Sequence, residues 1–436
     1  MKKANVWALL PIGFFVVLYL GLGITFEYIL KIPMGFYNVP IVVIFLISLL
    51  VACLQNRAID FEKKLSLMGQ GVGDKNIITM LLIFLLAGIF VGVVGRNSAE
   101  SVAYFLLSVF PARFAVCVIF IVSCFVSTAM GTSVGTITLL TPIAAAISMT
   151  SGFSLPLCVG TVVGGAMFGD NLSFVSDTTI AACNGQGCAM KDKFRTNFAI
   201  VLPAAIVTLI LILVLSLRAD IQPIETGSYD LIQIIPYVLV LIGGIIGINV
   251  FITLLIGVVS GCIIMLATGA MDIPSLLGSM GSGVSGMFET AMVAVLVAAL
   301  CALIREAGGF QALLNGIRRL FRGKRGGQLG IGLLVGLMDI STANNTVAIV
   351  MANPIASEMA KEYDISPRKT ASILDTFSGI FQGFLPYGAQ ILVALSAVSA
   401  MGMELGAFEL ISCLFYPMML LLSSLVFMFL IPERKK

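Results

Sequence analysis

Five acidic residues lie deep within apolar stretches of this 436-residue sequence: Asp170, Asp177, Glu289, Asp339 and Asp375. An ionised carboxylate at the centre of a bilayer costs about 3 kcal/mol on insertion scales. No lysine or arginine lies in the same apolar stretches as these acids. We therefore expect some of them to bind a proton or a cation. For Glu289 and Asp339, the alternative is a hydrogen bond to a neighbouring helix.

Asp170 has the most polar setting of the five. It follows the glycines of Gly164–Gly169, and the polar run Ser176–Thr179 comes shortly after it. Glycines and an Asp-Asn pair near the middle of an apolar run predict an unwound segment. Membranes tolerate unwound backbone only around a cavity or a buried site. Carboxylate, amide and hydroxyl oxygens, together with freed carbonyls, suit Na⁺.

The residues that we expect to couple a cation to a proton are Asp170, Asn171, Ser173, Asp177, Thr178 and Asp375. Na⁺ itself is expected at Asp170, Asn171 and Asp177. Two further polar breaks, Met130–Thr136 and Ser341–Thr346, are rich in hydroxyl and amide groups. As hairpin tips they would contact the ion or its co-substrate through Thr132, Ser133, Thr136, Asn344, Asn345 and Thr346. The alternative is a helix-packing patch of small residues.

The composition shows what kind of protein must position these groups. Hydrophobic residues make up 59% of the chain and charged residues 11%, against about 25% charged in soluble domains. This predicts an all-α polytopic membrane protein and excludes a soluble globule, a disordered chain and a nucleic-acid binder. The chain has no histidine, and its nine cysteines form no CxxC pair. We therefore expect no cofactor, with Na⁺ as the transported or coupling ion.

The order of polar breaks repeats along the chain, which is typical of duplicated transporter halves. Residues 1–218 would form one repeat, with a hairpin at about 113–150 and a broken span at about 156–184. Residues 231–436 would form the second, with a hairpin at about 328–360 and a broken span at about 370–400. An external linker, 219–230, would join them. The spans would break near the bilayer midplane.

Each half would contain five crossings, an odd number, so the two repeats are expected to have inverted topology. With both termini in the cytoplasm, only Lys31, Arg96, Arg113 and Arg218 of the 25 basic residues lie outside, which satisfies the positive-inside rule. The limbs of each hairpin span about 15–17 residues, fewer than the ~20 that cross a bilayer. This favours two re-entrant hairpins and ten crossings over two further pairs of crossings.

The motif Phe168-Gly169-Asp170-Asn171-Leu172-Ser173, followed by Ser176-Asp177-Thr178-Thr179, resembles the signature of NhaC-type Na⁺/H⁺ antiporters of the ion transporter superfamily. The hydroxyl-rich segment Gly131-Thr132-Ser133 also fits. The resemblance covers nearly the whole chain in length and segment order. It implies inverted repeats, two hairpins whose tips meet broken spans, and a homodimer in many relatives. It also extends to malate–lactate exchangers and apparent amino-acid carriers.

These observations favour a secondary antiporter that exchanges Na⁺ for H⁺ across the cytoplasmic membrane by alternating access. Without histidine, carboxylates must carry the proton. The alternative is a Na⁺- or H⁺-coupled transporter of a small organic anion or amino acid, whose carboxylate would lie at helix N-termini. An intramembrane aspartyl protease is disfavoured, because its Gly-x-Gly-Asp motif is replaced by Met167-Phe168-Gly169-Asp170. Duplicated broken spans suit alternating access better than a channel.

Overall fold

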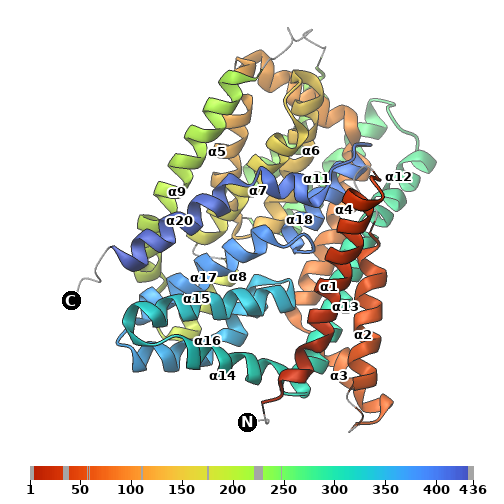
Figure 1. The fold of residues 1–436 in the computed structure, drawn as a ribbon. Coiled ribbons are helices and arrows are strands. Elements are labelled where there is room, and N and C mark those ends of the chain that lie inside the picture. The colour runs from red at the N-terminus through yellow and green to blue at the C-terminus, as the bar shows by residue number, and fades with distance from the viewer. Residues whose placement is uncertain are drawn as a thin grey trace.

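The structure is a computed structural model that describes residues 4–32, 39–55, 57, 59–109, 111–173, 176–219, 229–246 and 248–430. Throughout these ranges the secondary structure is helical, without a strand (Figure 1). The first half contains η1 (Val6–Leu9), α1 (Leu10–Ile24), η2 (Thr25–Ile29), α2 (Ile41–Gln55), α3 (Phe61–Val72), α4 (Lys75–Val109), α5 (Ala112–Met130), α6 (Ser133–Ser151), α7 (Leu155–Leu172), α8 (Asp177–Gln186) and α9 (Met190–Arg218). The predicted linker 219–230 lies mostly outside the described residues.

The second half contains α10 (Leu231–Ile246), α11 (Val250–Ala267), α12 (Ile273–Gly286), α13 (Phe288–Glu306), α14 (Gly309–Leu320), α15 (Gly323–Thr342), α16 (Asn345–Glu362), α17 (Pro367–Phe384), α18 (Ala389–Ala400), α19 (Ala407–Ser412) and α20 (Phe415–Phe429). The helices pack so that segments far apart in the chain meet. For example, α8 of the first half packs against α16 and α17 of the second.

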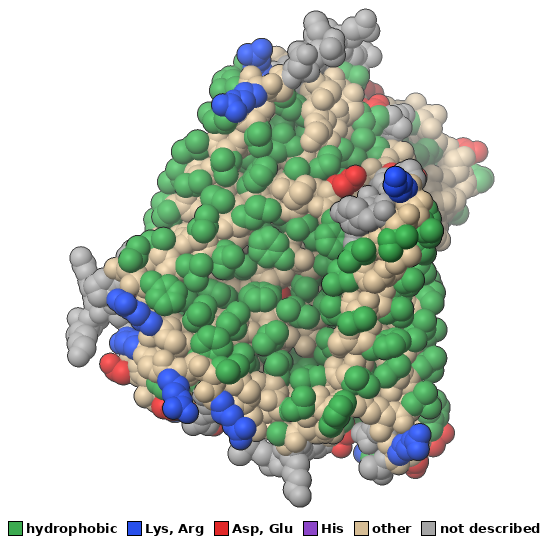
Figure 2. Space-filling view, viewed as in Figure 1, with side chains coloured by type: hydrophobic (Ala, Val, Ile, Leu, Met, Phe, Trp, Pro, Cys, Tyr) green, Lys and Arg blue, Asp and Glu red, His purple; other side chains and the backbone are tan. Residues whose placement is uncertain are grey.

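Large apolar side chains cover the outer surface of the helices. Figure 2 shows a broad hydrophobic face, with lysines and arginines gathered towards its upper and lower margins. Within the described residues, seven helices are long and apolar enough to cross a membrane, or eight if the bent pair α17 and α18 forms one span. Four further apolar helices are 10–17 residues long, so counting by length gives fewer than the predicted ten crossings. The chain is a multi-pass integral membrane protein.

Two helical hairpins form where the sequence predicts them. Gly131 turns the chain between α5 and α6 with a left-handed φ of 70°, and Thr132 caps α6. The turn between α15 and α16 uses Ala343, at a φ of 47°, and Asn344 caps α16. The predicted limb length is wrong, because these helices contain 18–20 residues. Limb length therefore does not distinguish re-entrant hairpins from full crossings, and the re-entrant arrangement stays a prediction.

The two spans that we expect to be broken are interrupted in the structure. The chain leaves the helix between α7 and α8, and α17 meets α18 at a bend of 42°. The predicted unwinding at Asp170 is wrong, because α7 continues to Leu172 and Asp170 lies in its last turn. The glycines have another role. A Cβ at Gly169 would lie 2.4 Å from the side chain of Ser127, so this glycine allows α7 to approach α5 closely.

Candidate functional site

Both hairpin tips and both broken spans meet at one small cavity of about 80 Å³. Tip 1, the turn between α5 and α6, lines it with Gly131–Ser133, and tip 2, the turn between α15 and α16, lines it with Asn344–Thr346. The α7–α8 span contributes Asp170 and the start of α8, and the second broken span contributes Gln390 from the first turn of α18. Together with Thr79 and Ile83 of α4, the cavity is thus built by five segments from both halves of the chain. Its lining includes the predicted residues Thr132, Ser133, Asp170, Asp177, Thr178, Asn344, Asn345 and Thr346.

Asp170 is the buried acid of this cavity. Its two carboxylate oxygens accept hydrogen bonds from different segments: Ser133 Oγ of tip 1 donates at 2.8 Å and Ser176 Oγ of the α7–α8 break donates at 2.5 Å. Gln390 Nε2 donates to Ser133 Oγ at 3.1 Å. Asp170 therefore links the first hairpin to its own broken span, and through Ser133 to the other broken span.

Asp177 and Thr178 begin α8 on the same side of the cavity. Thr178 is buried, and its hydroxyl lies 2.8 Å from Ser176 Oγ. Asp177 is exposed, unlike the deeply buried acid that the sequence suggests, because its side chain projects from the first turn of α8. A carboxylate at a helix N-terminus is stabilised by the helix dipole. The two acids of the motif thus have different environments, one buried and one open.

Asn171 and Asp375 do not line the cavity and meet in a separate polar network. Lys193 of α9 forms an ion pair with Asp375, with Nζ 2.7 Å from Oδ2, and both side chains are 1% exposed. Lys193 Nζ and Asn197 Nδ2 also donate to the carbonyl of Asn171, at 3.0 and 2.9 Å. Tyr416 OH donates to Asn171 Oδ1. The network fixes the C-terminal end of α7 to α9, α17 and α20.

This network corrects the expectation that the deep acids have no basic partner. Lys193 precedes the apolar run 197–217, so hydropathy alone leaves it in a polar loop, but α9 begins at Met190 and Lys193 is buried. Asn197 donates to Asp375 Oδ2 at 2.7 Å from the next turn of the same helix. The signal in the sequence is the four-residue spacing of Lys193 and Asn197, which places them on one face of a helix.

Two predicted residues have local roles in the described structure. Thr136 Oγ1 donates to the carbonyl of Thr132 at 2.9 Å, within the first turn of α6. Ser173 ends α7, and its N–H donates to the carbonyl of Gly169 at 2.9 Å. Both are buried and neither lines the cavity.

The second hairpin tip is held by the last turn of α17 and by the break that follows it. Gln382 Nε2 donates to the carbonyl of Ala343 at 3.0 Å, and Tyr387 OH donates to the carbonyl of Ile340 at 2.8 Å. Asn344 Oδ1 accepts from the N–H of Val347, which caps α16. Sequence reasoning missed Gln382, Tyr387 and Gln390 as parts of the site.

The remaining deep acids lie away from the cavity lining. Glu289 is an exposed residue in the first turn of α13. Asp339 is fully buried in α15, one turn before tip 2. Among the described residues, no group of three His, Cys, Asp or Glu side chains could hold a metal ion. The oxygen atoms around the cavity come from one exposed carboxylate, one buried carboxylate, hydroxyls and amides. This set suits a monovalent cation better than a divalent one.

Comparison with known proteins agrees with this architecture. The Na⁺/H⁺ antiporter family matches residues 6–217 and 222–430. The chain belongs to this family. Members of this family are transporters, and this chain is therefore a transporter.

Individual relatives are more distant. The chain is 28% identical to the Na⁺/H⁺ antiporter NhaC of Bacillus subtilis (strain 168) over 178 residues, which cover 38% of this chain and 39% of that protein. It is 26% identical to the malate-2H⁺/Na⁺-lactate antiporter of the same organism over 214 residues, covering 49% and 45%. The chain thus spans less than half the length of the curated relatives it matches.

Among solved structures, a YdaH transporter from Alcanivorax borkumensis is similar at 15% identity. The likeness covers 85% of this chain and 89% of that one, with a TM-score of 0.45.

Proposed function

We propose that this antiporter-family member exchanges Na⁺ for H⁺ across the cytoplasmic membrane, with Asp170 as the group that binds either ion. The supporting observation is the position of Asp170. It is a buried carboxylate at a cavity to which both hairpin tips and both broken spans contribute. Movement of either half would therefore change the surroundings of this acid.

The exchange chemistry follows from competition at one carboxylate. Burial disfavours the ionised form, so an empty site takes up a proton. A bound Na⁺ stabilises the ionised form and displaces that proton. The hydroxyls of Ser133 and Ser176 donate to Asp170 in the structure, and they can rotate to present lone pairs to a cation instead. The oxygens of Thr178, Asn344 and Asn345 lie around the same cavity and would complete the ligand set.

The ion pair between Lys193 and Asp375 has a positioning role in this proposal. Lys193 neutralises Asp375, so Asp375 is less suited than Asp170 to bind Na⁺. Lys193 also holds the carbonyl of Asn171, the residue that follows Asp170. Loss of one partner would leave a buried charge unpaired, which typically costs 3–5 kcal/mol. The pair would thus keep the last turn of α7 in place while the hairpin tips move.

The transport cycle that we propose uses the two halves as inverted repeats, 1–218 and 231–436, with both termini cytoplasmic and a homodimer as the assembly. Each half supplies one hairpin and one broken span to the cavity. Rocking of one half against the other would open the site to one side at a time. No covalent bond is made or broken, so the proposal is transport without an enzymatic reaction.

The test is ion flux in proteoliposomes that contain only the purified protein. An inward Na⁺ gradient is expected to drive H⁺ out and raise the internal pH reported by a trapped dye. The same gradient of choline is the control. A pH change with choline, or none with Na⁺, would contradict Na⁺/H⁺ exchange.

A second candidate function is exchange of a small organic anion coupled to Na⁺ or H⁺. The first turns of α6 and α16 both line the cavity, and helix N-termini bind carboxylates through backbone N–H groups. The relative named as a malate-2H⁺/Na⁺-lactate antiporter motivates the choice of solutes. Uptake of labelled malate or lactate that depends on Na⁺ or H⁺ would favour this function.

A further inference from the structure

Asp339 is an isolated carboxyl group in the core of the second half. It lies in α15, its side chain is 0% exposed, and neither of its side-chain oxygens has a hydrogen-bond partner within the described part of the chain. Its backbone carbonyl accepts the N–H of Ala343, which closes the last turn before tip 2. A buried polar group without a partner is rare in native structures and calls for an explanation.

An ionised carboxylate would be strongly disfavoured at this position. Burying an unpaired charge costs far more than burying a neutral acid, so such a group takes up a proton instead. Tyr387 of the α17–α18 break and Cys301 of α13 contact the backbone next to Asp339, at the carbonyls of Ile340 and Ser341. Neither ion pair found within the described residues includes Asp339. Burial without a charged partner therefore favours the protonated form of Asp339.

The end of α15 that carries Asp339 is held by polar contacts that can rearrange. Cys301 Sγ donates to the carbonyl of Ser341 at 2.8 Å, and Tyr387 OH donates to that of Ile340. The turn itself is strained, because Ala343 has a φ of 47°, which side chains other than glycine rarely adopt. These contacts join tip 2 to α13 and to the second broken span. A change at either element would therefore move the backbone that flanks Asp339.

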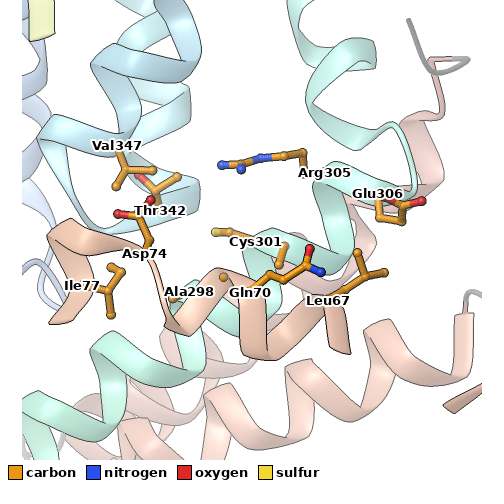
Figure 3. A pocket seen from close by; sticks show the side chains of 12 residues that line it. Leu67, Gln70, Asp74, Ile77, Ala298, Cys301, Arg305, Glu306, Thr342 and Val347 are labelled. Atoms are coloured by element: carbon orange, nitrogen blue, oxygen red, sulfur yellow. The ribbon is translucent and has the colours of Figure 1, made fainter. Parts of the chain in front are cut away.

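A second cavity, of about 220 Å³, is lined by Thr342 and Val347, which flank tip 2 in the chain. It lies between the α3–α4 junction, α13 and tip 2, and Figure 3 shows Asp74 and Arg305 extending towards Thr342 and Val347. Thr342 follows Asp339 by three residues, about 4.5 Å along a helix. Cys301 both lines this cavity and contacts the tip. Water in the cavity can thus approach within about one turn of Asp339.

We infer that Asp339 is a second proton-binding site, which exchanges its proton with this cavity when tip 2 moves. The inference rests on the proposed Na⁺/H⁺ exchange and deepens it. Asp170 would trade one proton for one Na⁺, and Asp339 would carry a further proton in the direction opposite to Na⁺. Two protons then move for each Na⁺, and one net positive charge crosses the membrane per cycle.

The first experiment measures protonation without transport. Infrared difference spectra of purified wild-type protein against Asp339→Asn, at neutral pH, should contain the carbonyl stretch of a protonated carboxylic acid. The band should shift in D₂O, because the proton exchanges. A difference spectrum with only carboxylate bands would show that Asp339 is ionised and would overturn the inference. This result does not depend on whether the protein exchanges Na⁺ for H⁺.

The second experiment measures stoichiometry in proteoliposomes. Wild-type exchange should be driven by membrane voltage alone, with about two protons per Na⁺. Asp339→Asn should approach one proton per Na⁺ and lose the voltage dependence, whereas Asp339→Glu should retain both. Gln328→Leu, at another buried polar residue of α15, is the matched control and should behave like wild type. Voltage-driven exchange with unchanged stoichiometry in folded Asp339→Asn would overturn the inference.

Discussion

Replacing Asp170 with Asn is the sharpest perturbation of the proposed exchange site. The amide keeps the size of the side chain and removes its titratable charge. Ser133 and Ser176 can rotate their hydroxyls to bond either the amide oxygen or the amide N–H₂. Because a neutral amide is cheaper to bury than an anion, we expect the variant to insert and fold.

The expected loss of Na⁺ binding follows from the charge that is removed. Removing one partner of a buried charge pair costs about 3–5 kcal/mol, and about 1.4 kcal/mol corresponds to a tenfold change in affinity. The affinity of Asp170→Asn for Na⁺ should therefore fall by roughly two to three and a half orders of magnitude. Exchange should be lost altogether, because the site has no group that can trade a proton for the cation.

Two assays separate binding from exchange. The rise in the melting temperature of the purified protein with increasing Na⁺ concentration reports the affinity for Na⁺. The Na⁺-driven pH change in liposomes reports exchange. Asp170→Glu keeps the charge and should retain part of both signals. Asp177→Asn is the matched control, since Asp177 is an exposed acid of the same cavity, and its effect should be smaller. Wild-type exchange in Asp170→Asn would refute the reasoning and pass the role to Asp177.

Three further outcomes are expected. Ser133→Ala and Ser176→Ala should each raise the apparent KM for Na⁺ several-fold in the liposome assay. The melting temperature of both variants in detergent should be almost unchanged. An unchanged KM in both would show that these hydroxyls only pack against their neighbours. Lys193→Met should destabilise the protein by about 3–5 kcal/mol, because it leaves Asp375 buried without its partner. Lys193→Met combined with Asp375→Leu should recover much of the lost melting temperature. Equal melting temperatures for the single and double variants would argue against the ion pair. Ala343→Gly should stabilise the protein by about 1 kcal/mol, since it relieves the left-handed backbone of tip 2, and a lower melting temperature would contradict that account.

Much of the architecture follows from the sequence because each feature has a local cause. The first break is signalled by the polar residues around Ser173 and Ser176, and the second by Pro386 and Gly388, each inside an apolar run. The hairpin turns are signalled by Gly131 and by the amide pair Asn344-Asn345. The resemblance to NhaC-type antiporters implies that the tips meet the broken spans, and the cavity around Asp170 shows them together.

Contacts between distant segments could not be predicted in the same way. Glycine inside a helix signals either unwinding or close packing, and the choice at Gly169 depends on the position of Ser127 on another helix. Lys193 lies just before the apolar run 197–217, so hydropathy places it in a loop. Its burial depends on Asp375, 182 residues later in the chain (375 − 193). Likewise, the sequence identifies Asp339 as a deep acid but gives no sign that its carboxyl group lacks a partner.

The central claim, that Na⁺ and H⁺ are the exchanged ions, is tested most directly by the wild-type protein in liposomes free of any organic solute. An inward Na⁺ gradient should raise the internal pH, and added malate or lactate should leave the rate unchanged. A pH change that appears only when malate or lactate is present would contradict the claim and would identify the protein as an organic-anion exchanger.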